Sequence, residues 1–394
     1  MHADIVIVGA GPAGARAAYA LARRGARVTI FDPSHPREKP CGGGVTGRAL
    51  SLVADAIDPG AFARTVIRAA RFTRPRAREA DPSGPLDFSA AVALDRDALV
   101  VSSRATFDAA LLSAAVSAGA VLERTRVANI SVDAACARLE TASGSRHASF
   151  VIGADGANSQ VRRRVAAAFR RDQLSIATGF FARGVTSEEI VIELTTDPPG
   201  YIWSFPRPDH LAIGICAQAD AGITVEALRA RTADWIAATR LADGAPLQPY
   251  SWPIPSLSAR DFDELTLAGP RWALLGDAAG LVDPITREGI FFALGSGDAI
   301  AEALATSNPA RAYAERVRDE AVSELSRAAQ LKAGFFRPAF TGLMMRALQQ
   351  SAAIRAVMAD LVAGRQSYAT LKWRLLKTLE VGLAWRALAD ISRP

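Results

Sequence analysis

The hydrophobic pattern at the start of the chain predicts a strand, a helix and a second strand. Asp4–Val8 is a short apolar run that ends at a glycine, as buried parallel strands do. Residues 12–24 are rich in alanine and predict a helix, with Gly25 as its C-terminal cap. Arg27–Phe31 predicts the second strand. This unit predicts an α/β fold with a doubly wound, Rossmann-like sheet.

Later stretches alternate between strand-like and helical patterns. Residues 33–47 form a loop rich in Pro and Gly. Strands are expected within 69–94, as a hairpin over 127–148 with a turn at Ser143–Gly144, at 150–153, as an antiparallel sheet over 176–218, and at 272–276. Helices are expected at 104–118, with Phe107, Leu111, Leu112 and Val116 on one face, at 289–304, and from Arg311 to the end.

Charge and cysteine content narrow the class of protein. The chain has 394 residues and a net charge of +6. From Leu331 onward, ten Lys or Arg and three Asp or Glu give 10 − 3 = +7, so the remainder carries 6 − 7 = −1. The basic excess therefore belongs to the C-terminal tail, and because this tail lacks a recognised nucleic-acid-binding motif we do not expect nucleic-acid binding. Cys41, Cys136 and Cys216 lie far apart without metal-ligand spacing, so we expect no metal site and a reducing, cytoplasmic location. We expect neither a secretory signal nor a membrane-spanning helix.

The first motif is a glycine-rich loop between the predicted strand and helix. Gly9 allows a tight turn, Gly11 lets the backbone approach a pyrophosphate, and Gly14 permits close helix–strand packing. The helix that opens at Pro12 and Ala13 presents its N-terminus to the phosphate charge. Asp32, at the end of the next strand, can accept hydrogen bonds from ribose hydroxyls. These residues predict a dinucleotide site.

Two further motifs favour FAD over NAD. Asp155 and Gly156 follow one predicted strand, and Gly276, Asp277, Gly280 and Pro284 follow another. The ribityl hydroxyls of FAD need a carboxylate, which Asp277 can provide. Free N–H groups at Gly289 and Ile290, where a helix begins, can face the pyrimidine edge of the flavin.

Together the three motifs resemble flavoproteins of the para-hydroxybenzoate hydroxylase type, and further matches resemble the geranylgeranyl reductase branch. The resemblance extends over essentially the whole chain, including C-terminal helices with Gly364 and Tyr368. The branch matches are Lys39-Pro-Cys41-Gly42-Gly43, Arg104 with Phe107-Asp108, Gly200-Tyr201-Ile-Trp203-Ser-Phe205-Pro206, and Gly276-Asp277 through Gly289-Ile290. We also assign Cys41, Gly42, Gly43, Arg104 and Val127 to the FAD site.

The resemblance implies a discontinuous FAD-binding domain and a substrate domain. We expect the FAD-binding domain in residues 1–75, 95–170 and 262–330, the substrate-binding sheet in 76–94 and 171–261, and a helical region in 331–394. It further implies that reduced flavin passes hydride to a double bond of an isoprenoid or other apolar substrate. Relatives in the wider fold are monooxygenases, so hydroxylation of an aromatic or peptidyl substrate through a flavin hydroperoxide is the alternative.

A flavoprotein that only binds or senses is a third possibility, and we expect an enzyme. The expected partners are a small or lipophilic molecule and, in the alternative, a protein-borne substrate. NAD(P)H is the expected electron donor, although no second dinucleotide loop is present; a ferredoxin is the other candidate.

Three residues are candidates for the chemistry. Cys41 can donate the proton that completes alkene reduction, or it can be a small packing residue in a glycine loop. On a strand, Tyr201 and Trp203 share one face with Phe205. That face forms either an aromatic wall of the substrate cavity or an ordinary packing surface.

Two features leave the function open. The related proteins usually have glycine where this chain has Arg287; its charge can favour an anionic reduced flavin, but because most arginines are exposed we expect it to point outward. In the basic tail, a stripe of leucines lies beside positive charges, which suits either contact with a membrane surface or docking on the chain's own domain. The stripe is Leu371, Leu375, Leu376, Leu379 and Leu383, beside Lys372, Arg374, Lys377 and Arg386.

Overall fold

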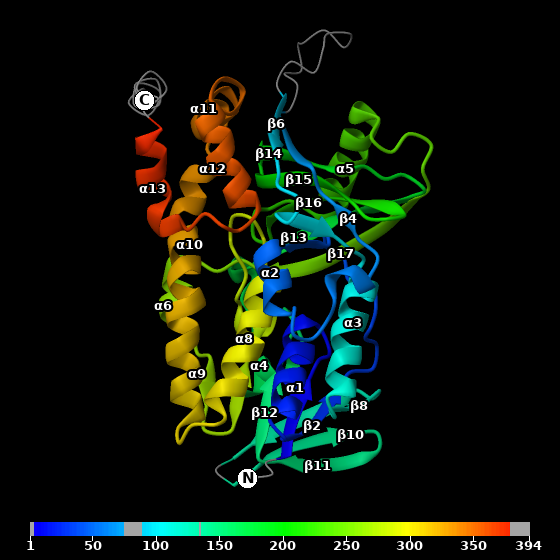
Figure 1. The fold of residues 1–394 in the computed structure, drawn as a ribbon, viewed down its shortest axis with the longest axis vertical. Helices are drawn as coiled ribbons and strands as arrows, with labels where there is room; N and C mark the ends of the chain where they lie inside the picture. Colours follow the sequence, from blue (N-terminus) through cyan, green and yellow to red (C-terminus); the bar gives the residue numbers. More distant parts are fainter. Residues whose placement is uncertain (1–3, 75–88, 134, 379–394) are drawn as a thin grey trace.

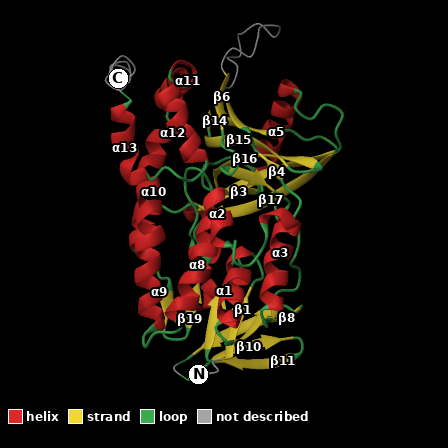
Figure 2. Ribbon diagram, in the orientation of Figure 1, coloured by secondary structure: helices red, strands yellow, loops and turns green. Residues whose placement is uncertain are grey.

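The computed structural model describes residues 4–74, 89–133 and 135–378 (Figure 1). Its strands gather at two levels, one near each end of the long axis, and helices run between and beside them (Figure 2). Within these residues, no helix combines the length and the apolar character needed to cross a bilayer.

The lower level is a six-stranded sheet built on the predicted strand–helix–strand unit. Its strands are parallel except for the edge strand β18. The order is β18 (Ala268–Gly269), β19 (Trp272–Leu274), β12 (Phe150–Gly153), β1 (Asp4–Val8), β2 (Arg27–Phe31) and β8 (Val121–Glu123). The α/β fold class is thereby confirmed, and the strands predicted at 150–153 and 272–276 are present.

Three helices lie side by side along this sheet, with α1 (Pro12–Arg23) between α3 (Arg104–Ser117) and α8 (Ile290–Ala303) (Figure 1). All three were predicted to within two residues. The assignment of Val116 to the buried face of α3 was wrong, because its side chain is 45% exposed. Residues 107, 111, 112 and 115 instead form that face.

Small sheets complete the lower half. The hairpin expected over 127–148 is a three-stranded sheet, β9 (Val127–Val132), β10 (Ala137–Thr141) and β11 (Gly144–Ala148), with the predicted turn between the last two strands. The loop expected over 33–47 ends in a short strand, β3 (Gly44–Thr46), followed by α2 (Gly47–Leu52). β3 pairs with β7 (Leu99–Val101), which also pairs with β4 (Thr65–Val66). Three residues are too short for a hydrophobic alternation to reveal such a strand.

The upper level is a seven-stranded sheet with α5 (Val225–Thr239) packed on one face. The antiparallel sheet expected over 176–218 is confirmed, because the four strands in this range pair antiparallel with one another. One of them, β14, also pairs with β5, which lies outside that range, and this contact is parallel. The order is β17 (Leu247–Pro255), β13 (Leu174–Arg183), β16 (His210–Gln218), β15 (Pro199–Pro206), β14 (Glu189–Thr196), β5 (Ala69–Thr73) and β6 (Ser89–Ala93). The division of the chain into domains at the boundaries given above stays a prediction.

The C-terminal part is helical, as predicted. A π-helical turn at Arg318–Val322 joins α9 (Pro309–Val317) to α10 (Ser323–Phe335), and together they form one long rod (Figure 1). Helices α11 (Pro338–Gln350) and α12 (Ala352–Val362) pack against β6, and α13 (Tyr368–Lys377) lies beside α10.

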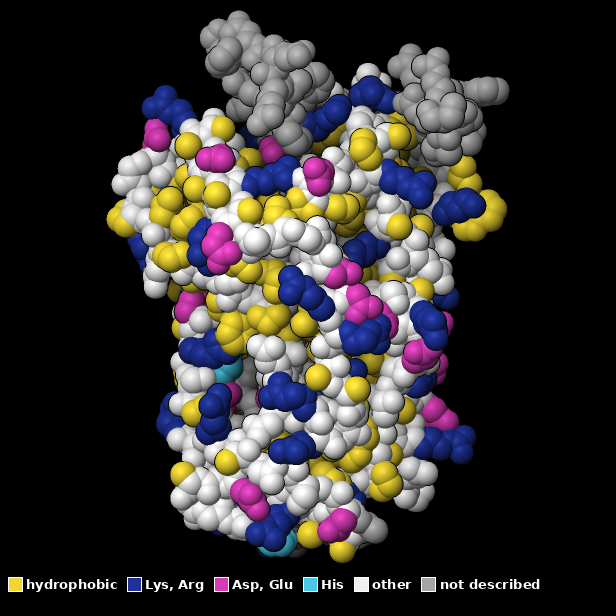
Figure 3. Space-filling view, turned by 180° about the vertical axis from the view of Figure 1, so that it is seen from behind, with side chains coloured by type: hydrophobic (Ala, Val, Ile, Leu, Met, Phe, Trp, Pro, Cys, Tyr) yellow, Lys and Arg dark blue, Asp and Glu magenta, His cyan; other side chains and the backbone are white. Residues whose placement is uncertain are grey.

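The predicted leucine stripe is only partly on one side of α13. Leu371 packs on the neighbouring core, whereas Leu376 is 55% exposed and Trp373 is 68% exposed. Leu379, Leu383 and Arg386 lie outside the described residues. On the face shown in Figure 3, basic side chains are interspersed with acidic ones and do not form a continuous patch. Contact with a membrane stays a prediction.

The crossing of α1 and α8 tolerates no side chain at Gly297. A Cβ atom there would lie 2.9 Å from the backbone nitrogen of Ala17 and 3.0 Å from the carbonyl oxygen of Ala13. We expect Gly297→Ala to lower the free energy of unfolding by about 1–3 kcal/mol, because the two helices must move apart. Urea unfolding of the FAD-loaded protein measures this change.

Gly295 on the same helix is the matched control, because nothing lies within 4 Å of the position of its Cβ. Gly295→Ala should leave stability unchanged or raise it by up to about 1 kcal/mol, since alanine favours helix. Equal effects of the two substitutions would show that the helix crossing does not limit stability.

Candidate functional site

A cavity of about 570 Å³ extends from the glycine-rich loop to the face of the upper sheet. Most of the predicted site residues line it: Gly9, Gly11, Pro12, Ala13, Asp32, Cys41, Gly42, Gly43, Arg104, Val127, Asp155, Gly156, Tyr201, Trp203, Asp277, Gly289 and Ile290. Predicted residues that do not line it are Gly14, Gly276, Gly280 and Pro284. These four residues are buried.

The glycine-rich loop has the geometry of a phosphate cradle. Gly9 has φ +103°, and a Cβ there would lie 2.4 Å from the carbonyl oxygen of Ala154. A Cβ on Gly14 would lie 2.0 Å from the carbonyl oxygen of Gly9, so only glycine lets α1 start so close to the loop. No side chain caps the N-terminus of α1. Its free N–H groups can therefore bind an anionic phosphate at the cavity.

Asp32 at the end of β2 is held by several donors. Its carboxylate accepts hydrogen bonds from the backbone nitrogen atoms of Ala10, Ser34 and His35 and lies 2.8 Å from His35 Nδ1. Burial opposes ionisation of Asp32, but these bonds, led by the one from His35, hold its pKa well below the ordinary range. Asp32 is therefore ionised at neutral pH and suited to accept from hydroxyl groups.

A buried polar chain joins this acid to Cys41. His35 Nε2 lies 3.4 Å from Asp108, which accepts two hydrogen bonds of 2.8 Å from Arg104. Arg104 Nη1 lies 3.7 Å from Cys41 Sγ. The sequence pointed to Arg104 and Cys41 but not to His35 as a member of this chain of contacts. The pairing of Arg104 with Asp108 could have been predicted from their i, i+4 spacing on α3.

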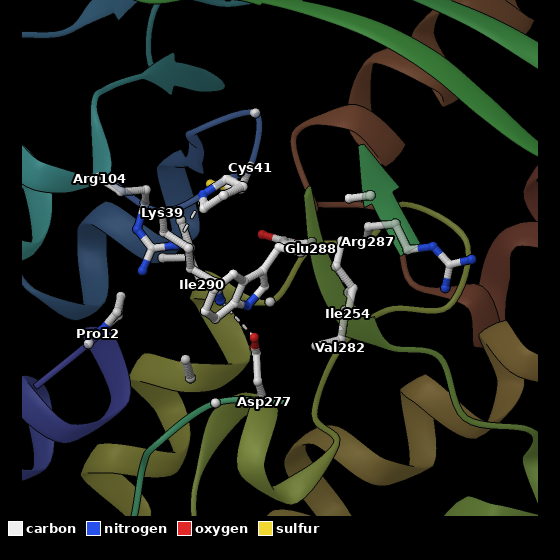
Figure 4. Close-up of a pocket in the computed structure, with 18 of the residues that line it drawn as sticks. Pro12, Lys39, Cys41, Arg104, Ile254, Asp277, Val282, Arg287, Glu288 and Ile290 are labelled. Atoms are coloured by element: carbon white, nitrogen blue, oxygen red, sulfur yellow. Dashed lines mark hydrogen bonds and ion pairs between the residues drawn. The ribbon is translucent and has the colours of Figure 1, made fainter. Parts of the chain in front are cut away.

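Asp277, the predicted partner of the ribityl hydroxyls, lies at the start of α7 (Gly276–Ala279). Its carboxylate pairs with Lys39 Nζ at 2.8 Å (Figure 4). Burial opposes ionisation of Asp277, but the charge of Lys39, its hydrogen bond and the charge of Arg104 together keep the pKa below the ordinary value. Sequence reasoning did not foresee this ion pair, which joins residues far apart in the chain. Gly289 precedes α8, whose N-terminus has no side-chain cap either.

Asp155 has a different surrounding. Its carboxylate accepts hydrogen bonds from Ser159 Oγ and from the backbone nitrogen atoms of Gln160 and Val161, at the start of α4 (Gln160–Val165). Burial nevertheless raises its pKa above the ordinary value. Asp155 thus fixes a helix terminus at the wall of the cavity.

The loop at Cys41 is fixed against the aromatic strand β15. Arg207 is fully buried and donates from Nη2 to the carbonyl oxygen of Cys41 at 2.7 Å. A Cβ on Gly42 would lie 1.8 Å from the ring of Phe205, so the aromatic ring rests directly on this glycine. The hydroxyl of Tyr201 donates to the carbonyl oxygen of Thr286 at 2.9 Å. The aromatic face therefore forms one wall of the cavity. That this wall contacts a substrate stays a prediction.

Arg287 is not the outward surface charge that we expected. It lines the cavity in a half-buried position and donates from Nη1 to the hydroxyl of Ser256. Its φ of +62° is a conformation that glycine adopts without strain, which explains why related proteins have glycine there. In Figure 4 its guanidinium points away from Lys39, Cys41 and Asp277.

The comparisons agree with this geometry. A family described as FAD binding domain matches residues 2–316, so the chain belongs to this class of FAD-dependent oxidoreductases. The chain is 30% identical over 371 residues to digeranylgeranylglycerophospholipid reductase of Methanothrix thermoacetophila, covering 86% of this chain and 88% of the relative. It is 31% identical over 323 residues to menaquinone reductase of Mycolicibacterium smegmatis, with 76% of each covered. The chain belongs to the geranylgeranyl reductase family, as the resemblance predicted.

Solved structures with the same fold include two kinds of flavoprotein. A geranylgeranyl bacteriochlorophyll reductase-like protein of Thermoplasma acidophilum has a TM-score of 0.76 at 20% identity, covering 95% of this chain and 99% of that one. A triple mutant of a flavin-dependent brominase has a TM-score of 0.72 at 19% identity, with the same coverage. At these identities the likeness establishes the fold alone.

The surroundings of His35 lead to a test by pH. Burial lowers the pKa of His35, but its contacts with Asp108 and Asp32 outweigh burial and raise that pKa above 6.5. The resulting stabilisation is complete below about pH 6.5 and is lost as pH rises through the folded-state pKa. We expect the free energy of unfolding to fall between about pH 6 and about pH 9 by more in the natural protein than in His35→Gln. Urea unfolding across this range measures the difference.

His147→Gln, on the exposed strand β11, is the control and should retain the pH profile of the natural protein. A His35→Gln profile parallel to that of the natural protein would contradict the stabilising role of protonated His35.

Proposed function

We propose that this protein uses FAD to reduce carbon–carbon double bonds of an isoprenoid or similarly apolar substrate, with NAD(P)H as the electron donor. The observation that supports this proposal most directly is a single cavity that extends from the phosphate cradle and Asp277 to a wall of apolar side chains. That wall is formed by Phe72, Leu99, Ile190, Ile192, Leu194, Tyr201, Trp203, Phe205, Ile254, Phe335, Met358, Leu361 and Val362. The names of the reductase relatives agree with this proposal.

FAD, when bound and reduced, supplies the hydride. The residues present fit this cofactor, because the loop at Gly9 admits no side chain and two uncapped helix N-termini face the cavity. Asp277 can accept from the ribityl hydroxyls and Asp32 from the ribose. The backbone N–H groups at Gly289 and Ile290 can hold the pyrimidine edge in register with the apolar wall.

Cys41 is the proposed source of the proton. Its thiol lies in the cavity wall, its carbonyl oxygen is fixed by Arg207, and its sulfur is in contact with Arg104. A rigid position at the junction of the cofactor residues and the aromatic wall is what a proton donor to a substrate carbon requires. Tyr201 and Trp203 orient the substrate by packing, since the Tyr201 hydroxyl is already donated to Thr286.

Anaerobic turnover tests the reaction. FAD-loaded protein is reduced under argon, and an unsaturated isoprenoid alcohol or its phosphate is added. We expect flavin reoxidation without oxygen and a product that has gained a hydrogen pair per double bond, as seen by mass spectrometry. Reoxidation only on admission of oxygen, with substrate-dependent oxygen uptake, would overturn the proposal in favour of oxygen insertion.

Replacement of the thiol tests the proton donor. We expect Cys41→Ser to lower the rate of double-bond reduction by about 10²–10⁴-fold, because general acid catalysis contributes that much, while flavin content and flavin reduction by NAD(P)H persist. A solvent isotope effect on turnover should change with it. Cys136→Ser, at a cysteine that does not line the cavity, is the control. Full turnover of Cys41→Ser would leave Cys41 as a packing residue.

A further inference from the structure

Arg287 carries a positive charge into the cavity without an acidic partner. Within the part of the chain that the structure describes, its one side-chain hydrogen bond is to the neutral hydroxyl of Ser256, and its Nε is buried with no acceptor. No carboxylate lies within 4.0 Å of it among these residues. A half-buried guanidinium that uses so few of its donors is electrostatically uncompensated.

A second cation reinforces this charge. Lys332 of α10 reaches the same hydroxyl, with Nζ 2.8 Å from Ser256 Oγ and 2.7 Å from Gln218 Oε1. Both acceptors are neutral. Burial first, and then the charge of Arg287, lower the pKa of Lys332 to about 7, against weaker opposing effects of Cys216 and Asp220. Arg287 and Lys332 thus share one serine, and of these three residues Arg287 is the one that lines the cavity.

Two other cations that line the cavity have acidic partners: Lys39 is paired with Asp277, and Arg104 with Asp108. Arg37, Arg126 and Arg163 line it as well and form no ion pair within the described residues. In Figure 4 the Arg287 side chain lies on the side of Ile254, away from Lys39, Cys41 and Asp277. Ile254 belongs, with Tyr201, to the apolar side chains that line the same cavity.

We propose that Arg287, supported by Lys332, binds an anionic oxygen group, a carboxylate or a phosphate, at one end of an otherwise apolar substrate. This inference rests on the proposed function in that it places the substrate in the same cavity. An anion would accept from the free guanidinium N–H groups, and such charge-assisted bonds are the strong ones. Because apolar side chains adjoin the charge, the fitting ligand is a chain with a charged end, not a small free ion.

Binding of defined probes to the FAD-loaded protein tests the inference. The probes are decyl phosphate, decanoate, decanol and inorganic phosphate, measured by isothermal titration calorimetry. We expect Arg287→Gly to weaken the binding of decyl phosphate or decanoate by about tenfold or more and to leave the affinity for decanol unchanged. Glycine suits φ +62°, so this variant should fold at least as well as the natural protein. Arg287→Lys keeps the charge but loses the guanidinium donors, so it should bind the anionic probes more weakly than the natural protein and more tightly than Arg287→Gly.

Arg240 provides the matched control. It is the other described non-glycine residue with positive φ, at +57°, and its side chain is 79% exposed. Arg240→Gly relieves the same backbone strain and removes a surface charge, so it should not alter binding of any probe. Anion binding near pH 7 should also take up a proton at Lys332, seen as a dependence of binding heat on buffer ionisation, and Lys332→Met should abolish this uptake.

Several outcomes would overturn the inference. It would be overturned if Arg287→Gly bound both anionic probes as tightly as the natural protein does. It would also be overturned if the affinity for decanol fell by the same factor as the affinity for the anionic probes. Inorganic phosphate that binds as tightly as decyl phosphate would indicate a site for a free anion. A shift in the flavin reduction potential with unchanged probe affinity would show that Arg287 acts on the cofactor. These binding results do not depend on turnover, so failure of anaerobic reduction with intact, Arg287-dependent binding would overturn the proposed function alone.

Discussion

The close crossing of α1 and α8 is the constraint on which the site depends. Two helices can bring their N-termini to one cavity only if their axes approach closely, and here the backbone of α1 touches α8 at a glycine. Arg16 on α1 strengthens this contact by an ion pair with Asp298 on α8. Because neither N-terminus is capped by a side chain, their free N–H groups supply two electropositive points at a fixed separation. A long cofactor that carries a phosphate group and, at a distance from it, a ring edge with carbonyl oxygens can place one of these groups at each helix N-terminus.

Local sequence determined the part of the site that lies within one strand–helix–strand unit. Gly9, Gly14 and Asp32 were predictable because turn geometry, close packing and strand ends are short-range properties. The pairs of Lys39 with Asp277 and of His35 with Asp108 were not, since each joins elements that only the folded chain brings together. The same limit applies to the sheets: the parallel contact between β14 and β5 is not visible in the alternation of either strand.

Side-chain direction was the other limit. Val116 has the spacing of a buried helix position, but it faces solvent because Ala115 occupies the contact instead. Arg287 has the composition of a surface residue, and yet the fold turns it inward. In both cases the residue type alone gives a preference, and the neighbouring elements decide. The glycine of related proteins at position 287 was the available signal, because it indicates a backbone conformation with positive φ.

The conformation and surroundings of Arg287 have a cost in stability. Arg287 adopts a backbone conformation that costs a non-glycine residue about 1 kcal/mol, and it also withdraws a cation from water without an anion to balance it. Lys332 adds a second positive charge beside it, although either alone would be more stable. A strained backbone conformation and an unpaired half-buried charge at the same residue are expected mainly at functional sites. Since glycine would remove the strain and the charge at once, the arginine is best explained by a ligand that supplies the missing negative charge.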